Sequence, residues 1–197
     1  MPFHAPLAPT EQDAIAGFLA QQQDAFRAAI FGLTDAEAGR QGAASTLTVG
    51  TLVKPGAGVQ RSWLASAVAA PERPVDARSQ EQQMADYAAE FSWLEGDTVD
   101  AAIAAFDEVS ATVLHAVRDL DLDTSVPVPQ APWFPQDVEA WNVRWVWFHL
   151  LEELARHAGH ADIIREGVDG ATMYALVAAR EEMPATPWLT PWQRAEG

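Results

Sequence analysis

Apolar residues recur at spacings of three, four and seven along much of the chain, which is the period of an amphipathic helix. The pattern predicts four long helices, over residues 10–31, 45–70, 98–120 and 138–165, and a short one over 171–181. Each apolar stripe has to be buried against another, so the pattern predicts an all-α four-helix bundle. The predicted stripes of the first three helices are Ile15, Phe18, Leu19, Phe26 and Ile30, then Leu52, Val59 and Trp63, then Ala102, Phe106, Val109, Val113 and Val117.

The predicted helices are separated by segments rich in proline and charge. Residues 70–83 (APERPVDARSQEQQ) are expected to form an exposed loop leading into an irregular stretch around Trp93, and the four prolines within 119–137 exclude a helix there. Thr10 and Asp97 are candidate N-caps, and Gly170 suits a helix end. No alternating strand pattern is present, so we expect one domain over 1–197, with an ordered C-terminal tail whose tryptophans lie against the bundle.

Charge and composition exclude several classes of function. The 28 acidic residues outnumber the 12 basic ones and give a formal charge of −16, which disfavours binding to nucleic acid and to anionic membrane surfaces. The chain has no cysteine, so any thiol chemistry needs a thiol from outside. Neither a signal peptide nor a membrane-spanning stretch is recognisable, and we expect a cytoplasmic protein.

A polar cluster interrupts the apolar pattern of the last long helix. Glu153, His157 and His160 fall on one arc, because spacings of four and three bring side chains to the same face. A glutamate and a histidine four residues apart can both reach one divalent ion, and this donor set suits zinc, nickel, manganese or iron. The same arc also holds His149, Val146, Leu150 and Ile164, so we expect it to face the core.

The same histidines have a simpler interpretation as core or surface residues, because histidines three residues apart are common by chance. Two donors on one helix do not close a metal site, and a third must come from elsewhere. His4 lies near the N-terminus, and His115 is off its helix's apolar stripe, so we expect it to be solvated. Glu152 and Arg156 have the spacing of a surface ion pair.

Four segments of the chain occur in an order that is typical of one protein superfamily. They are GLTDAEA at 32–38, LTVGTLVK at 47–54, RWVWFHLLEELARHAGHADIIREGVDG at 144–170 and WLTPW at 188–192. Together they resemble the DinB-like superfamily, in particular an actinobacterial branch. The resemblance covers nearly the whole chain and implies a four-helix bundle with up-down-down-up topology. It also implies kinship with mycothiol-dependent maleylpyruvate isomerase and with low-molecular-weight-thiol S-transferases.

The resemblance further implies a divalent metal held by one histidine of the second helix and a pair on the last. That pair maps to Glu153 and His157, with His160 as a neighbouring substitute ligand. The remaining ligand falls at Pro55, in LVKPGAG, where the branch has histidine followed by leucine. Proline has no donor atom and costs about 3 kcal/mol inside a helix, so a kinked or interrupted helix is expected. The sequence therefore predicts a degenerate metal site built from Glu153, His157 and His160.

Two classes of function remain open. The first is a thiol-dependent S-transferase or isomerase acting on a small electrophile, in which a divalent metal lowers the pKa of a low-molecular-weight thiol. The second is a metal-free, small-molecule-binding or stress-related protein, with Trp63, Trp141 and Trp145 lining its cavity. Metal-free acid/base chemistry by Glu153 and His157 is a third interpretation. The resemblance to the superfamily implies a homodimer, and the tryptophans of WNVRWVW (141–147) are consistent with one.

Overall fold

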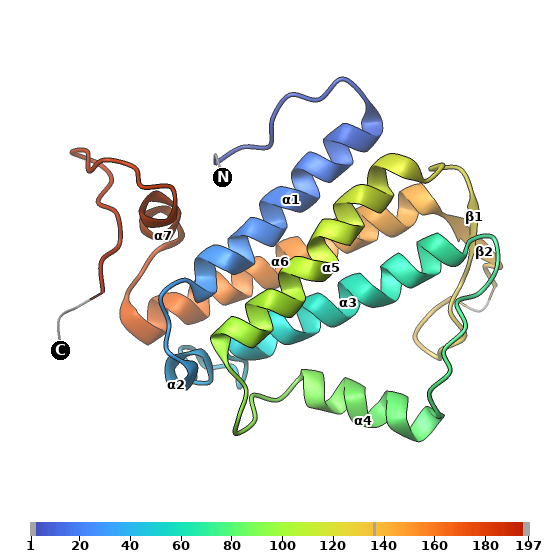
Figure 1. Ribbon diagram of the computed structural model, residues 1–197, viewed down its shortest axis with the longest axis horizontal. Coiled ribbons are helices and arrows are strands. Elements are labelled where there is room, and N and C mark those ends of the chain that lie inside the picture. The colour runs from blue at the N-terminus through green and yellow to red at the C-terminus, as the bar shows by residue number, and fades with distance from the viewer. Residues whose placement is uncertain (1–2, 136, 195–197) are drawn as a thin grey trace.

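The computed structural model describes residues 3–135 and 137–194, and four long helices dominate it (Figure 1). They are α1 (Glu11–Ile30), α3 (Gly50–Ala69), α5 (Val99–Asp119) and α6 (Val143–Asp169). The smaller elements are α2 (Asp35–Ala38), α4 (Gln80–Glu90), β1 (Ser125–Pro127), β2 (Ala140–Asn142) and α7 (Met173–Arg180). The predicted all-α bundle is confirmed.

Side-chain contacts at the two ends of α1 and α6 show that these helices are parallel. Near their N-termini, Arg144 pairs with Glu11 at 2.7 Å. Near their C-termini, the fully buried Arg165 donates to the carbonyl oxygen of Ala29 at 2.8 Å. The guanidinium of Arg165 thus satisfies a carbonyl that the end of α1 leaves without a helical partner.

Helices α3 and α5 are also parallel to each other. Lys54, early in α3, pairs at 2.7 Å with Asp97, just before α5, and Gln60 lies 3.3 Å from the Ser110 hydroxyl further along. Lys54 also lowers the pKa of Asp97, which stabilises the charged pair. A parallel pair of consecutive bundle helices needs a long connection, and α4 lies within it (Figure 1).

Helices α1 and α5 run in opposite directions. Arg27, near the end of α1, pairs with Asp107, and Arg118, near the end of α5, lies 3.5 Å from Asp13. Since α1 and α6 share one direction while α3 and α5 share the other, the topology is up-down-down-up. This matches the topology that the resemblance implies.

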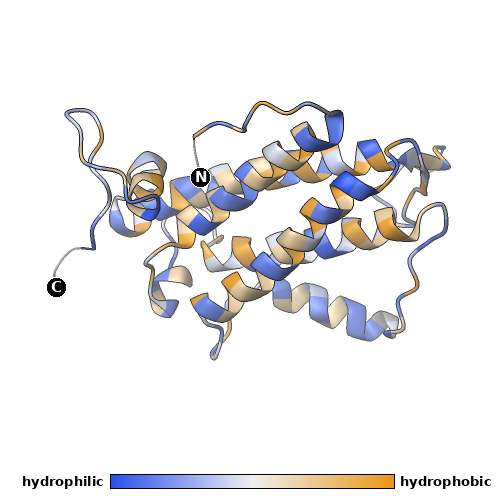
Figure 2. Ribbon diagram, turned by 45° about the horizontal axis from the view of Figure 1, so that its top comes forward, coloured by the Kyte–Doolittle hydropathy of each residue, from blue (hydrophilic) through white to orange (hydrophobic). Residues whose placement is uncertain are grey.

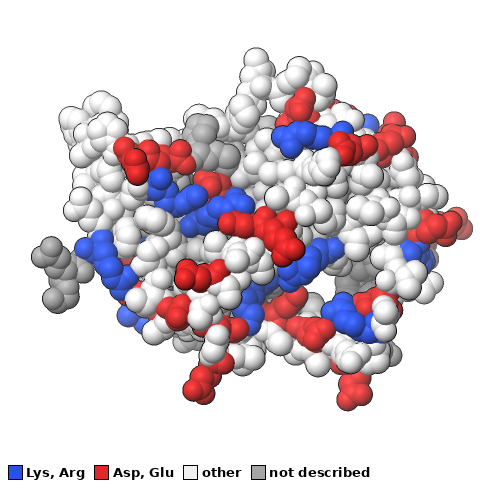
Figure 3. All heavy atoms as spheres, in the orientation of Figure 1, with Lys and Arg blue, Asp and Glu red and all other residues white. Residues whose placement is uncertain are grey.

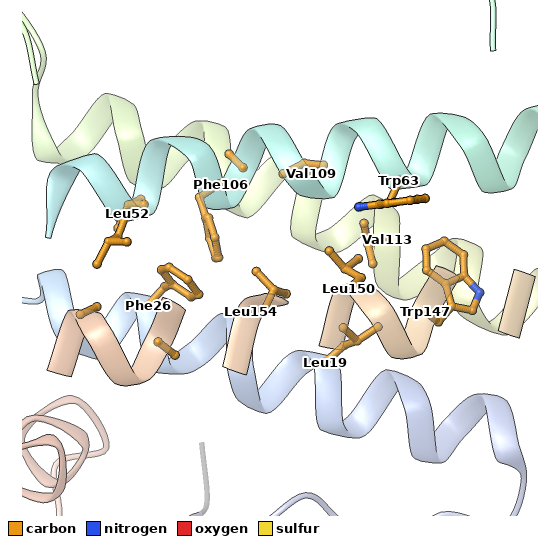
Figure 4. Packing of buried hydrophobic residues seen from close by; sticks show 14 of the residues in the cluster. Leu19, Phe26, Leu52, Trp63, Phe106, Val109, Val113, Trp147, Leu150 and Leu154 are labelled. Atoms are coloured by element: carbon orange, nitrogen blue, oxygen red, sulfur yellow. The ribbon is translucent and has the colours of Figure 1, made fainter. Parts of the chain in front are cut away.

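Hydrophobic residues recur along the four long helices (Figure 2), and their buried side chains interdigitate between these helices to form the core (Figure 4). Phe26 and Phe106 meet with ring centroids 5.2 Å apart at its centre. Most of the predicted stripe residues are buried, but Phe18 is 50% exposed, and Val59 and Ala102 are only partly buried. The core also encloses polar side chains, among them Gln23, which donates to Gln60 at 2.8 Å.

The helix ends show which local signals were sufficient. Thr10 caps α1 by accepting from the backbone N–H of Asp13 at 3.1 Å, and Gly170 ends α6 with φ +78°. The predicted cap at Asp97 is wrong, because Thr98 caps α5 instead. Asp97 accepts from the backbone N–H of Leu94 and from Lys54, so its carboxylate is already engaged.

Two predictions for the connecting segments are wrong. Helix α4 begins inside the segment expected to be a loop, since Ser79 and Gln82 form a capping box that starts it. Strands β1 and β2 pair antiparallel, with Val126 opposite Trp141, but strands of three residues are too short to show an alternating pattern in the sequence.

The two tryptophans of the C-terminal tail differ in their packing. Trp192 packs on Phe31 as expected, whereas Trp188 is 83% exposed, so the expectation that it lies against the bundle is wrong.

The sequence predicts a kink or an interruption of the helix at Pro55. Helix α3 is continuous through Pro55, so an interruption is not present. Leu52, Val53, Gly56 and Ala57 around it are all buried in the bundle. Their burial compensates for the hydrogen bond that proline removes from the helix.

The close approach of the α2–α3 connection to α6 generates a stability prediction. A Cβ atom at Gly167 would collide with the backbone carbonyl of Gly42, whereas a Cβ at Gly159 in the same helix meets open space. We expect Gly167→Ala to lower the free energy of unfolding by about 2 kcal/mol. Gly159→Ala should raise it by about 0.5–1 kcal/mol. Urea denaturation of both variants measures the difference, and equal effects would contradict the close contact.

Candidate functional site

Helix α6 places three polar side chains on successive turns of one face. Glu153 lies between the two histidines that are four residues away on either side of it. Its Oε2 lies 3.5 Å from His157 Nε2, and its Oε1 lies 4.0 Å from His149 Nε2. Both distances are within the range of an ion pair, and both exceed the usual length of an N–H···O hydrogen bond. The structure therefore joins the predicted Glu153–His157 pair to a further residue, His149.

These polar groups lie on the flank of the buried stripe of α6. The stripe is centred on Leu150, Leu154 and Ala161, all of which are fully buried. The side chains of Glu153 and His157 keep 31% and 36% of their surface exposed. The expectation that the arc faces the core is therefore wrong for its polar members, because the true centre of the stripe is rotated toward Leu154. The pair is accessible to a small molecule while remaining partly desolvated.

His160 is separated from the pair. It is exposed, and its ring centroid lies 5.9 Å from that of His157. In the described part of the chain, no group of three or more histidine, aspartate or glutamate side chains has the arrangement needed for a metal ion. His149, Glu153 and His157 span eight residues, or about 12 Å along a helix, so all three cannot converge on one ion.

Pro55 lies at the level of the candidate pair. Trp63 of α3 contacts His149, while Gly42, before the start of α3, contacts Ile164. Helices α3 and α6 are therefore antiparallel, and counting eight residues back along α3 and forward along α6 brings Pro55 opposite His157. The nearest turn of α3 thus presents a residue without a donor atom.

An aromatic cluster adjoins the site at the N-terminal end of α6. The rings of Trp141 and Trp145 stack at 3.7 Å, and Trp145 stacks in turn on His149 at 4.8 Å. The buried Trp63 contacts all three rings and also Phe134, at centroid distances of 4.9–6.0 Å. The predicted grouping of these tryptophans is thus observed, but they pack against one another and anchor His149.

The remaining polar predictions concern residues outside the site. His115 is solvated as expected and lies 3.1 Å from Asp119. Glu152 and Arg156 form the expected surface pair at 3.1 Å. On the face shown in Figure 3, basic side chains lie next to acidic ones. Burial raises the pKa of Asp162 to about 6, and the charge of Glu166 adds to the effect.

His149 is the functional candidate that sequence reasoning did not select. Its signal was present, because Trp141, Trp145, His149, Glu153 and His157 follow one another at a constant spacing of four. Spacing shows a shared face but not which ring packs on which. The contacts with Trp63 come from another helix and could not be inferred from the spacing.

The up-down-down-up bundle and the Glu–His pair on its last helix define a DinB-like protein. Comparison with models of known protein families narrows this class. Residues 14–170 match the family described as MST, mycothiol-S-transferase, and the chain belongs to that family. A comparison with curated proteins finds no match. Within the described residues, no helix is long and apolar enough to cross a membrane.

The aromatic cluster generates a second stability prediction. Trp63 is 6% exposed and contacts four other rings, whereas Trp133 is 79% exposed and contacts only the edge of the cluster. We expect Trp63→Ala to destabilise the fold by about 3–5 kcal/mol and Trp133→Ala to change it by under about 1 kcal/mol. Thermal and urea unfolding measure both. A small loss of stability in Trp63→Ala would contradict tight packing of the cluster and would indicate that its rings line a cavity.

Proposed function

We propose that this protein is a thiol-dependent S-transferase that joins an external low-molecular-weight thiol to a small electrophile. The observation that carries the proposal is the Glu153–His157 pair, 3.5 Å apart and partly exposed on the flank of α6. Family membership supports the thiol chemistry, and the absence of cysteine means that the sulfur comes from the thiol substrate.

In the proposed reaction, His157 acts as the base. The neutral imidazole takes the proton of the thiol, which leaves a thiolate, the nucleophilic form of sulfur. The thiolate forms a carbon–sulfur bond with the electrophile, the bond to the leaving group breaks, and the leaving group takes the proton from His157. The charge of Glu153 stabilises the imidazolium during the reaction.

The residues at this position do not fit a three-ligand metal site. Pro55 supplies no donor, the exposed His160 has its ring centroid 5.9 Å from that of His157, and the described residues contain no metal-binding cluster. The proposed mechanism therefore uses no metal. With Glu153 and His157 as its two protein ligands, a metal ion would bind weakly, because a tetrahedral site needs further protein ligands.

The alternative function is a metal-free protein that binds a small molecule without converting it. One observation favours it, namely the partly exposed stack of Trp141 and Trp145 beside the pair, since flat apolar surfaces suit ligands as well as packing. The homodimer expected from the sequence also stays a proposal. Phe148 and Ile163, which are 49% and 61% exposed on α6, are the residues to test at such an interface.

Thiol transfer should depend on the pair. We expect His157→Gln to reduce the rate of thioether formation between mycothiol and a small aryl halide by 10²–10⁴-fold, the usual contribution of a positioned base. His115→Gln, on the exposed face of α5, is the matched control and should leave the rate unchanged. Product formation followed by mass spectrometry measures both. Absence of any transfer by the native protein would favour the binding function.

Metal content should depend on position 55. We expect the tag-free native protein to hold well below one equivalent of nickel, zinc or manganese after soaking and desalting. Pro55→His should bind the metal at least about tenfold more tightly, because it restores a third donor opposite His157. Pro55→Ala is the control, because it removes the proline without adding a metal ligand. Near-stoichiometric metal in the native protein, measured by elemental analysis, would refute the metal-free mechanism.

A further inference from the structure

We propose that His149 is a positioning residue that holds the Glu153 carboxylate against His157. The inference rests on the proposed function for its kinetic consequence, but its structural content is independent of any reaction. Glu153 faces an imidazole on each side, with one oxygen toward each. A carboxylate held in this way presents one fixed oxygen to the base.

Two aromatic rings fix the orientation of His149. Its imidazole is stacked on Trp145, with the centroids 4.8 Å apart and the planes 14° from parallel. Trp63 of α3 meets the same imidazole edge-on, at 4.9 Å and 78°. Rings held by two perpendicular contacts from two helices cannot turn without displacing one of them. The direction of the two ring nitrogens is thereby determined.

That orientation directs each nitrogen of His149 at a carboxylate. Nε2 lies 4.0 Å from Glu153 Oε1, and Nδ1 lies 3.7 Å from Glu152 Oε2. Glu152 is largely exposed and is also bound by Arg156 at 3.1 Å, so it has a partner apart from His149. Glu153 has only the two histidines within ion-pair distance among the interactions of the described residues. His149 is therefore the group that restrains the outer oxygen of Glu153.

The state of His157 reports on this restraint. Its Nδ1 is buried and has no hydrogen-bond partner among the described residues, whereas its Nε2 faces Glu153. A neutral imidazole carries its proton on the nitrogen that faces an acceptor, so His157 should have the Nε2–H form. When Glu153 is released, its side chain regains rotamer freedom and the preference for that form weakens.

Nitrogen-15 spectra of histidine-labelled native-sequence protein at a single neutral pH test the proposal directly. His149→Phe keeps a ring between Trp145 and Trp63 but removes both nitrogens, while His149→Gln keeps a donor near Glu153 without the ring. We expect His149→Phe to convert His157 from a single Nε2–H form to a mixture of tautomers. His149→Gln should retain more of the native form, and His115→Gln should leave the His157 signals unchanged.

The kinetic arm uses the same variants in the thiol-transfer assay. We expect kcat to fall by at least about tenfold in His149→Phe with KM within about twofold, because the base is misoriented while the substrates still bind. If the native protein transfers no thiol but the His157 tautomers still change, the proposed function fails and the positioning role stands. Native tautomers and native kcat in folded His149→Phe would overturn the positioning role. If His149→Phe does not fold, His149→Gln provides the test. Loss of the native His157 tautomer in that variant would contradict the proposal that a donor at position 149 restrains Glu153.

Discussion

Burial of one stripe of α6 against α1 and α3 is the constraint on which the rest of the structure depends. Leu150, Leu154 and Ala161 fix the rotation of this helix about its own axis. Glu153 follows Leu150 by three residues, and His157 follows Leu154 by three residues. Once the rotation of α6 is fixed, these two side chains have to lie on the flank of the buried stripe. The position of Glu153 and His157, partly buried and partly exposed, is thus a consequence of hydrophobic packing.

The same helix geometry limits what the site can do. Side chains spaced by four residues form a ladder along α6, in which each residue meets its neighbours and none meets the residue beyond. A metal ion needs donors that converge from more than one element, and α3 presents Pro55 at this level. A proton acceptor needs only one neighbour to orient it. The ladder therefore suits base catalysis better than metal binding, and His149 extends it toward the aromatic cluster.

The neighbourhood of Pro55 shows how a bundle absorbs a local conflict. Proline is unfavourable inside a helix, yet α3 continues through it because the adjacent residues are buried on both sides. Next to it, Gly56 lets Phe26 and Phe106 approach within 3.3 and 3.2 Å of the place where a Cβ atom would stand. The aromatic rings fill the space that a larger residue at position 56 would occupy. The helix and the core are consistent with each other around this departure from the superfamily pattern.

The sequence by itself determined the four long helices, the caps at Thr10 and Gly170, and the Glu153–His157 pair, because these depend on spacing within one helix. It gave the up-down-down-up topology only through resemblance to a superfamily. The tertiary structure decided the burial of the arc, the contacts of His149, the separation of His160 and the continuity of α3. These depend on contacts between helices, above all Trp63 with His149 and the stripe of α6 with its neighbours. A periodic pattern shows which residues share a face, but the angle at which that face meets the core is set by the packing of several helices at once.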